Sequence, residues 1–357
     1  MSADFSPQAL LAGAGEPLEL ARHCGFFVGI DRVERGDSHC ASGQMYVECL
    51  IPTRLRHPLP LVMIHGGGGQ GLDYLFTPDG REGWAHWFVR RGYAVYVVDR
   101  PGHGRAPYHP DLLGPMSGAP TYEFMSSMFT APAAANKWPQ ARLHTQWPGS
   151  GQVGDPTLDQ FMAGGGPAIA SFRDSHAAAA KAGRALLEAI GPAVLMTHSA
   201  GGPCGWTIAD AKPDKVRGIV AIEPLGPPFL ERADGRFDWG LAAAPLTYDP
   251  PVAEPGELRT EPRAAPGPGL ADCLVQAEPA RKLVNLSKVP VLVVTAEASW
   301  MSRDNHGIVD YLRQAGVTTE HWRLEAHGIH GNGHAMMLEK NSDRIAALLE
   351  TWIRAAS

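Results

Sequence analysis

A serine flanked by small residues stands at the end of a short apolar run and could act as a nucleophile. The run covers 193–196, and residues 197–201 then read Thr-His-Ser-Ala-Gly before a stretch typical of a helix. A strand that turns sharply into a helix at a serine lifts the hydroxyl above the sheet, with a backbone N–H beside it to receive negative charge. Ser199 is therefore the candidate nucleophile. Thr197 stands where such turns usually carry glycine, so the turn must find room in another way.

A glycine-rich run could supply the donors that hold an oxyanion. Residues 65–69 read His-Gly-Gly-Gly-Gly and follow a second apolar run at 61–64. Glycine permits the unusual dihedral angles that turn backbone amides inward. We expect the N–H of Ala200, directly after the serine, to act together with that of Gly67 or Gly68. A phosphate-binding loop is disfavoured because the run lacks the Gly-Lys-Ser/Thr ending.

A histidine-rich loop near the C-terminus carries the candidates for the base that takes the serine proton. Residues 326–334 read Ala-His-Gly-Ile-His-Gly-Asn-Gly-His, and His334 is preferred because it ends a loop and directly precedes a helical pattern. The chain order nucleophile, acid, histidine also favours it. His330 is the alternative. A metal site made of these two and His327 is disfavoured because no carboxylate or cysteine pattern accompanies them. Neither a metal nor another cofactor is expected.

Two glutamates are candidates for the acid that orients the base. Sheets of this kind often carry an aspartate a few residues past the penultimate strand, but Ser299 stands there in this chain. Glu223 ends the apolar run 216–222, and its longer side chain could reach the same imidazole N–H. We prefer Glu223 and keep Glu297 as the alternative. Either carboxylate could instead cap a helix or pair with an arginine.

Two segments break the pattern of strands and helices. Residues 105–170 and 225–285 are rich in proline and glycine, and loops of this length are usually functional lids or disordered. The first is too apolar for a solvated linker, so we expect a cap over the site; the alternative is an excursion on the surface that never touches substrate. His103, which follows another strand, is expected to be structural or pocket-lining rather than catalytic. The full set expected to line the pocket is His198, His103, Phe124, Met128, Trp147 and Phe161.

The remaining elements predict the fold. Strands alternating with helices indicate an α/β fold with a mostly parallel sheet and helices on both faces. In such sheets sites form beyond the carboxyl ends of the strands. We expect one domain, 1–357, that carries the two insertions. The first two strands are expected to form an antiparallel pair joined by a polar turn. The expected strands are 26–30, 45–50, 61–64, 93–98, 193–196, 216–222, 289–295 and 320–324, and the expected helices are 84–91, 174–190 and 336–354.

Composition excludes several classes of protein. The 357 residues carry a formal charge of −6, which offers no footprint for nucleic acid or an anionic membrane. Five cysteines with scattered spacing predict reduced thiols rather than a disulfide framework or a metal site. Apolar runs fall short of the roughly 20 residues that span a bilayer. The first twenty residues lack a signal-peptide pattern, so a cytoplasmic location is expected.

These motifs together resemble the α/β-hydrolase superfamily. The run His65-Gly66-Gly67-Gly68 resembles the oxyanion loop of that superfamily. Residues 99–104 resemble its turn after the fourth strand, and residues 198–202 resemble its nucleophile elbow. More narrowly, the chain is similar to a group of bacterial esterases with a Ser–His–Glu triad. The stretches that carry this likeness are 77–80, 146–149, 154–156, 246–251 and 328–332.

The resemblance implies a fold, a chemistry and a set of residues. In the esterase group the acid follows strand six, which corresponds to Glu223, and the base corresponds to His334. Family analogy suggests a homodimer. We therefore expect a serine hydrolase that cleaves small carboxylic esters or lactones through an acyl-enzyme, and the apolar cap favours an uncharged or aromatic ester.

Other functions stay open on the same residues. An acyltransferase, an amidase or a hydrolase of carbon–carbon bonds could use the same triad. Dehalogenase and epoxide hydrolase chemistry is disfavoured because those relatives carry aspartate where Ser199 stands. A different class is a ligand-binding protein on a hydrolase scaffold, whose mark would be a broken triad.

Overall fold

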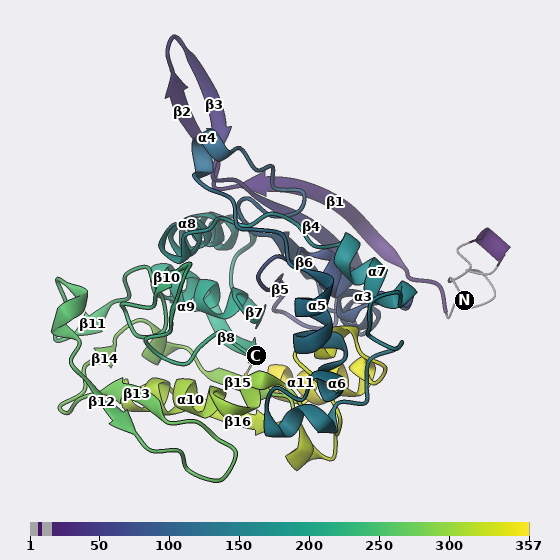
Figure 1. The fold of residues 1–357 in the computed structure, drawn as a ribbon. Coiled ribbons are helices and arrows are strands. Elements are labelled where there is room, and N and C mark those ends of the chain that lie inside the picture. Colours follow the sequence, from purple (N-terminus) through teal and green to yellow (C-terminus); the bar gives the residue numbers. More distant parts are fainter. Residues whose placement is uncertain (1–5, 9–15, 357) are drawn as a thin grey trace.

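An eight-stranded sheet with helices on both faces organises the chain (Figure 1). The computed structural model describes residues 6–8 and 16–356. The strand order is β1-β4-β6-β5-β7-β8-β15-β16, and β4 pairs antiparallel with both its neighbours while the others pair in parallel. The predicted mostly parallel α/β fold is confirmed. The strands are β1 (Leu20–Val28), β4 (Met45–Pro52), β5 (Leu61–Ile64), β6 (Val95–Asp99), β7 (Ala193–His198), β8 (Val216–Ile222), β15 (Val291–Thr295) and β16 (Thr319–Arg323).

Helices bury both faces of the central strands. Strands β5, β7 and β15 are buried along their whole length, which explains their uninterrupted apolar sequences. The core on one face includes residues of α8 (Phe172–Ile190), α9 (Gly201–Ala211) and α10 (Asn305–Gln314). The core on the other face includes residues of α2 (Leu72–Leu75), α3 (Trp84–Arg90) and α11 (Ser342–Ala356). Because these strands run in parallel, their carboxyl ends lie together at one edge of the sheet, between the two helix layers.

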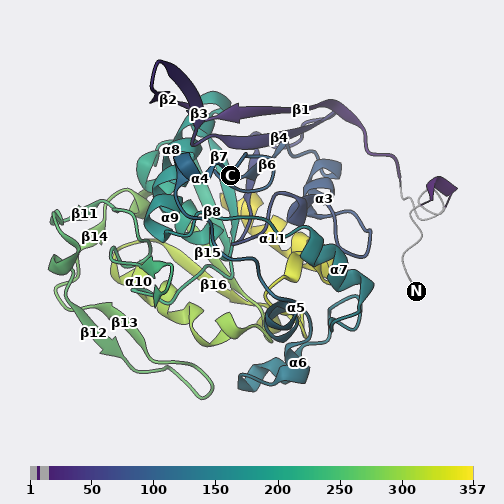
Figure 2. The ribbon, with the colours of Figure 1, turned by 45° about the horizontal axis from the view of Figure 1, so that its top comes forward.

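The structure differs from the sequence-based expectation near both ends of the chain. The first two strands pair as expected, but a second hairpin, β2 (Asp31–Arg35) and β3 (Ser38–Ser42), replaces the polar turn and projects from the molecule (Figures 1 and 2). The last helix begins at Ser342, because Met336–Leu338 forms a separate 3-10 turn that is buried in the core. The base candidate thus lies on a longer loop than the helical pattern suggested.

The two proline-rich segments contain short elements rather than long ones. The first holds four short α-helices, a π-helical turn and a 3-10 turn: α4 (Pro110–Leu113), α5 (Tyr122–Met125), Ser126–Thr130, α6 (Pro132–Ala135), Pro139–Leu143 and α7 (Pro156–Ala163). The second holds small strand pairs: β9 (Glu231–Arg232) with β10 (Gly235–Arg236), β11 (Tyr248–Asp249) with β14 (Lys282–Leu283), and β12 (Thr260–Arg263) with β13 (Cys273–Gln276), and a 3-10 turn, Pro255–Glu257. Three further 3-10 turns follow, Leu286–Lys288, Trp300–Arg303 and Leu324–His327.

The start of α9 packs against the end of β5, and this contact generates a stability prediction. A Cβ added at Gly201 would lie 2.6 Å from the carbonyl oxygen of His65 and 2.8 Å from that of Ile64. Alanine favours a helix over glycine by about 1 kcal/mol. Overpacking against backbone that cannot rotate away costs about 1–3 kcal/mol. The cost exceeds the gain, so we expect Gly201→Ala to lower the free energy of unfolding by up to about 2 kcal/mol, measured by urea denaturation.

Gly256→Ala is the matched control, because a Cβ there would meet no atom within 4 Å. It should change the free energy of unfolding by less than about 0.5 kcal/mol. Equal free energies of unfolding in the two variants would show that the close contact between Gly201 and the end of β5 does not limit the side chain at position 201.

Candidate active site

The turn after β7 has the geometry of a nucleophile elbow. Ser199 has a φ of 50°, in the left-handed region that residues other than glycine rarely adopt. Its N–H donates to the carbonyl of Ile222 at 3.0 Å, and its own carbonyl accepts from Leu225 at 2.9 Å and from Gly202 at 2.8 Å. Because these bonds tie the turn to the end of β8, the strained backbone is held by its surroundings.

The unusual threonine before the serine is accommodated by a glycine on the following helix. Thr197 is fully buried. A Cβ added at Gly205 would lie 2.7 Å from the Thr197 methyl carbon, so any larger residue there would collide with it. The room that Thr197 needs is therefore made one turn into α9.

The two preferred partners of the serine lie in contact. Glu223 directly follows β8 with a φ of 48°, and its Oε2 lies 2.8 Å from Nδ1 of His334. The same carboxylate accepts from the backbone N–H of Ala296 at 2.6 Å and from the hydroxyl of Ser299. Both side chains of the pair are fully buried. Burial raises the pKa of this carboxyl well above its usual range, whereas the hydrogen bonds from Ser299 and Ala296 act in the opposite direction. A carboxylate at this position would accept from Nδ1–H and so fix the imidazole in the tautomer that leaves Nε2 free.

The outer nitrogen of the imidazole is free. Nε2 of His334 is buried and has no hydrogen-bond partner in the described part of the chain, Ser199 included. Trp300 lies against the ring at a centroid distance of 4.0 Å, and Phe129 contacts it edge-on at 5.3 Å. Burial in this aromatic surrounding lowers the pKa of His334 to about 3, with a further contribution from the charge of Arg232. The imidazole is therefore neutral at pH 7 and can accept a proton at Nε2.

The glycine-rich loop lies beside the elbow. A Cβ added at Gly66 would lie 3.2 Å from the Ser199 Cβ, and one at Gly67 would lie 3.3 Å from the Ala200 Cβ. Neither the Gly67 nor the Ala200 amide donates to another group among the described residues. Gly68 has a φ of 65°, and its carbonyl accepts from Gly166 at 2.8 Å. The predicted oxyanion donors thus lie around the serine with free N–H groups.

The alternative residues have other partners. Glu297 accepts from the amide of Gly331 at 2.8 Å and lies 3.2 Å from Nδ1 of His330, whose side chain is exposed. The ring of His327 lies tilted against that of Trp322, at a centroid distance of 4.9 Å. The three C-terminal histidines therefore do not converge, and among residues 6–8 and 16–356 no three or more His, Cys, Asp or Glu side chains could hold a metal ion.

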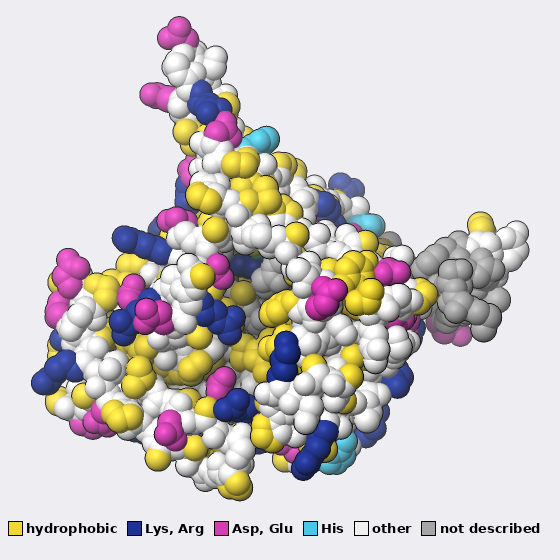
Figure 3. Space-filling view, in the orientation of Figure 1, with side chains coloured by type: hydrophobic (Ala, Val, Ile, Leu, Met, Phe, Trp, Pro, Cys, Tyr) yellow, Lys and Arg dark blue, Asp and Glu magenta, His cyan; other side chains and the backbone are white. Residues whose placement is uncertain are grey.

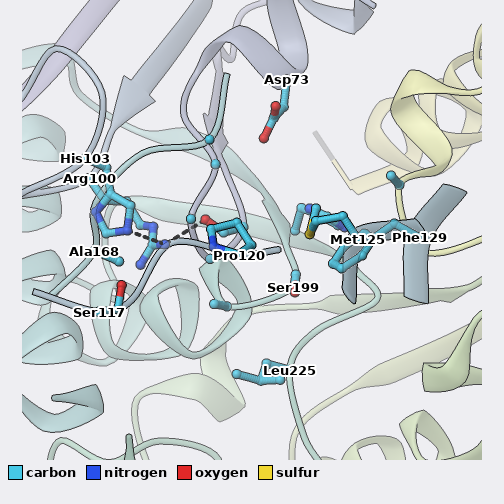
Figure 4. A pocket seen from close by; sticks show the side chains of 18 of the residues that line it. Asp73, Arg100, His103, Ser117, Pro120, Met125, Phe129, Ala168, Ser199 and Leu225 are labelled. Carbon is cyan, nitrogen blue, oxygen red and sulfur yellow. Dashed lines mark hydrogen bonds between the residues drawn. The ribbon is translucent and has the colours of Figure 1, made fainter. Parts of the chain in front are cut away.

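A cavity of about 330 Å³ opens over the serine. In the view of Figure 4, Ser199 lies between Arg100 and His103 on one side and Met125 and Phe129 on the other. The face drawn in Figure 3 is hollowed near its centre, with hydrophobic side chains along much of the rim. Segment 105–170 supplies much of the wall, and segment 225–285 adds Leu225, Arg232 and Asp234.

Four of the six predicted lining residues belong to the wall: His198, His103, Phe124 and Phe161. The prediction was wrong for Met128 and Trp147, which are not among the residues that line it. Trp147 is buried, its indole donates to Asp155 at 3.1 Å, and its ring packs against Phe161 from behind the wall. Met128 lies on the π-helical turn whose neighbouring Phe129 faces the cavity instead.

Sequence reasoning missed the residues that hold the base loop in place. The buried carboxylate of Glu339 accepts from the Gly333 amide at 2.9 Å and from Asn332 Nδ2 at 2.6 Å, and it lies 2.6 Å from His144 Nε2. The Gly-Asn-Gly spacing marked the loop, but no local signal links it to a histidine about 190 residues earlier. His198 Nε2 also lies 2.9 Å from the carbonyl of His334, and burial lowers the pKa of His198 well below its usual range.

Comparison with known proteins places the chain in a family. The family model for the alpha/beta hydrolase fold matches residues 60–265. A protein of Fungal sp. (strain ATCC 74256) named "Probable secreted lipase phiG" is 43% identical over 314 residues, which cover 87% of this chain and 85% of that protein. The word "secreted" in that name gives no support to the cytoplasmic location expected from the sequence.

A solved structure, described as the atomic resolution structure of a novel bacterial esterase, has the same fold. It superposes with a TM-score of 0.64 at 22% identity and covers 96% of this chain and 98% of its own. The elbow, the buried acid–base pair and the extent of these matches lead to one conclusion: the chain belongs to the α/β-hydrolase family.

Proposed function

We propose that this protein is a serine hydrolase that cleaves carboxylic esters through an acyl-enzyme. The observation that carries the proposal is the buried pair in which Glu223 holds Nδ1 of His334 while Nε2 has no partner. An imidazole fixed in this tautomer, next to a serine on an elbow, is the arrangement that activates a hydroxyl. The relative named as a lipase and the esterase of similar fold support the same class of reaction.

The proposed reaction has two halves, acylation of Ser199 and hydrolysis of the acyl-enzyme, and the same residues act in both. Ser199 Oγ attacks the ester carbonyl while its proton passes to Nε2 of His334. The amides of Gly67 and Ala200 donate to the oxyanion, and each such donor is worth roughly 3 kcal/mol in the transition state. His334 then gives the proton to the departing alcohol, and a water molecule repeats the sequence to release the acid. Glu223 stabilises the imidazolium that forms in each half.

The walls of the cavity favour a small ester, and segment 105–170 is proposed as its cap. Aromatic and methionine side chains on one side suit an uncharged acyl or alkyl group. A lactone, which is a cyclic ester, could be cleaved by the same residues. No helix among the described residues is long and apolar enough to cross a membrane. The cytoplasmic location and the homodimer stay predictions.

A fluorophosphonate probe tests the proposed function. The probe should label the wild-type protein, and Ser199→Ala should lose both labelling and turnover of p-nitrophenyl butyrate because the nucleophile is gone. Ser117→Ala is the control, since Ser117 also lines the cavity and should keep both activities. Labelling measured by mass spectrometry at another residue, or none at all, would contradict the proposal and favour a binding protein.

If Glu223 is the acid that orients His334, its replacement should slow catalysis. Glu223→Gln keeps the shape but can no longer accept from Nδ1 as a carboxylate, so kcat should fall by about 10³–10⁴-fold. Glu297→Gln is the matched control because its contacts are with the Gly331 amide and the exposed His330. It should stay within about threefold of wild type in steady-state assays. The reverse ranking would give the acid role to Glu297.

The pKa of the base predicts the acid limb of the pH profile. Only the neutral imidazole accepts a proton, so kcat/KM falls as the pH drops through the pKa of His334. Because burial lowers this pKa to about 3, activity should persist well below the usual histidine range near 6.5. We expect kcat/KM at pH 5 within about threefold of its value at pH 7, with circular dichroism to verify folding. A tenfold loss in a folded protein would contradict the assignment.

A further inference from the structure

A buried arginine without an acidic partner lies behind the oxyanion loop. Arg100 is 3% exposed and forms no ion pair with any described carboxylate. Its Nη2 donates to the carbonyl of Gly66 at 2.8 Å and to Nε2 of His103 at 3.1 Å, contacts that Figure 4 marks with dashed lines. Its Nη1 has only distant neutral partners, Ser175 Oγ and Cys204 Sγ, each at 3.5 Å. Its Nε has none among the described residues.

Burying the Arg100 guanidinium without an acidic partner costs free energy of folding, so we expect this charge to serve a function. The histidines around it do not share the charge. Burial, and next to it the charge of Arg100 itself, lowers the pKa of His65 and of His103 well below the usual range, so both rings are neutral. The positive charge is therefore directed at the one carbonyl that Arg100 contacts closely.

That carbonyl belongs to the peptide that carries a proposed oxyanion donor. The bond between Gly66 and Gly67 is trans, and in a trans peptide the C=O and the N–H point in opposite directions. The Gly66 oxygen is held from a second side by His65 Nδ1 at 2.8 Å. His65 is oriented in turn, because its Nε2 accepts from the backbone N–H of Arg100 at 3.0 Å. Two donors on the oxygen thus turn the Gly67 N–H away from Arg100.

We propose that Arg100 is a positioning residue that aims and polarises the Gly66–Gly67 peptide, so that the Gly67 N–H becomes a stronger oxyanion donor. A cation at the oxygen end of a peptide draws electron density from its nitrogen, and hydrogen bonds in such a chain strengthen one another. Arg100 also lines the cavity, but in this role it acts on the transition state through the peptide rather than by contact with the reacting atoms. The inference rests on the proposed function for its effect on rate.

Binding of a trifluoromethyl ketone tests the inference. The Ser199 oxygen adds to the ketone carbon, its proton passes to His334, and the ketone oxygen becomes the oxyanion. In Arg100→Gln and Arg100→Met the ketone should bind about 30–100-fold more weakly, while KM for the matching ester changes less than about threefold. Arg100→Lys keeps the charge and should bind the ketone at least tenfold more tightly than Arg100→Gln. If Arg100→Met does not fold, the comparison of lysine with glutamine still decides.

Arg105→Met is the matched control, five residues along the same loop. Arg105 is paired with Asp99 at 2.7 Å and with Glu48, so its loss should lower the melting temperature without weakening ketone binding selectively. Equal ketone affinities in the lysine and glutamine variants, or parallel losses of ester and ketone binding, would overturn the inference.

The crystal structure of Arg100→Gln separates this inference from the proposed function. It should show the Gly66 carbonyl turned from its wild-type direction, whether or not the protein hydrolyses esters. An unmoved peptide would overturn the positioning role even if the wild-type protein proves to be an esterase. Absence of probe labelling in the wild type would instead count against the proposed function alone.

Discussion

The burial of one carboxylate constrains the whole site. Glu223 lies in the core, where an ionised group without partners would cost far more than the stability of the domain. Its oxygens are satisfied by the Ala296 amide, the Ser299 hydroxyl and the imidazole of His334. These donors come from two loops that follow different strands. The carboxylate therefore forces both loops to meet at the end of β8.

The elbow is built against the same edge of the sheet. Bonds from Ile222 and Leu225, which flank Glu223, hold the left-handed backbone of Ser199. Close approaches at Gly201 and Gly205 bring α9 against β5 and β7 with no space for a side chain. Ser199, Glu223 and His334 are thus fixed relative to one another by backbone contacts rather than by the side chains alone. Such rigid placement is what a preorganised site requires.

The strands and the three short motifs of the site could be predicted from the sequence, because local patterns and chain order determine them. The expected strands overlap all eight strands of the sheet, although β1 begins at Leu20 rather than at Phe26. The elbow, the glycine loop and the histidine loop each have a signature within a few residues. Contacts between distant segments were beyond its reach. Ser299 stands where the sequence pattern predicts an aspartate, and in the structure its hydroxyl donates to the carboxylate of Glu223. The sequence alone gave no sign that Gly205 makes room for Thr197.

Segment 105–170, the proposed cap, shows the same limit more strongly. Its composition marked an apolar segment, but which side chains face the cavity depends on short turns without periodicity. Phe124 and Phe161 line the wall, while Trp147 is held behind it by Asp155 and a π-helical turn presents Phe129 in place of Met128. The bent backbone of such turns is set by packing, and one residue of offset exchanges a lining side chain for a hidden one.

We propose that the Ser199 hydroxyl is activated by the imidazole of His334 beneath two backbone amides. The most direct test is a crystal structure of the protein after reaction with diethyl p-nitrophenyl phosphate. We expect phosphorus bonded to Ser199 Oγ, the phosphoryl oxygen within hydrogen-bond distance of the Gly67 and Ala200 nitrogens, and His334 Nε2 facing the adduct. An adduct on another residue, or an imidazole turned away from Ser199, would contradict it.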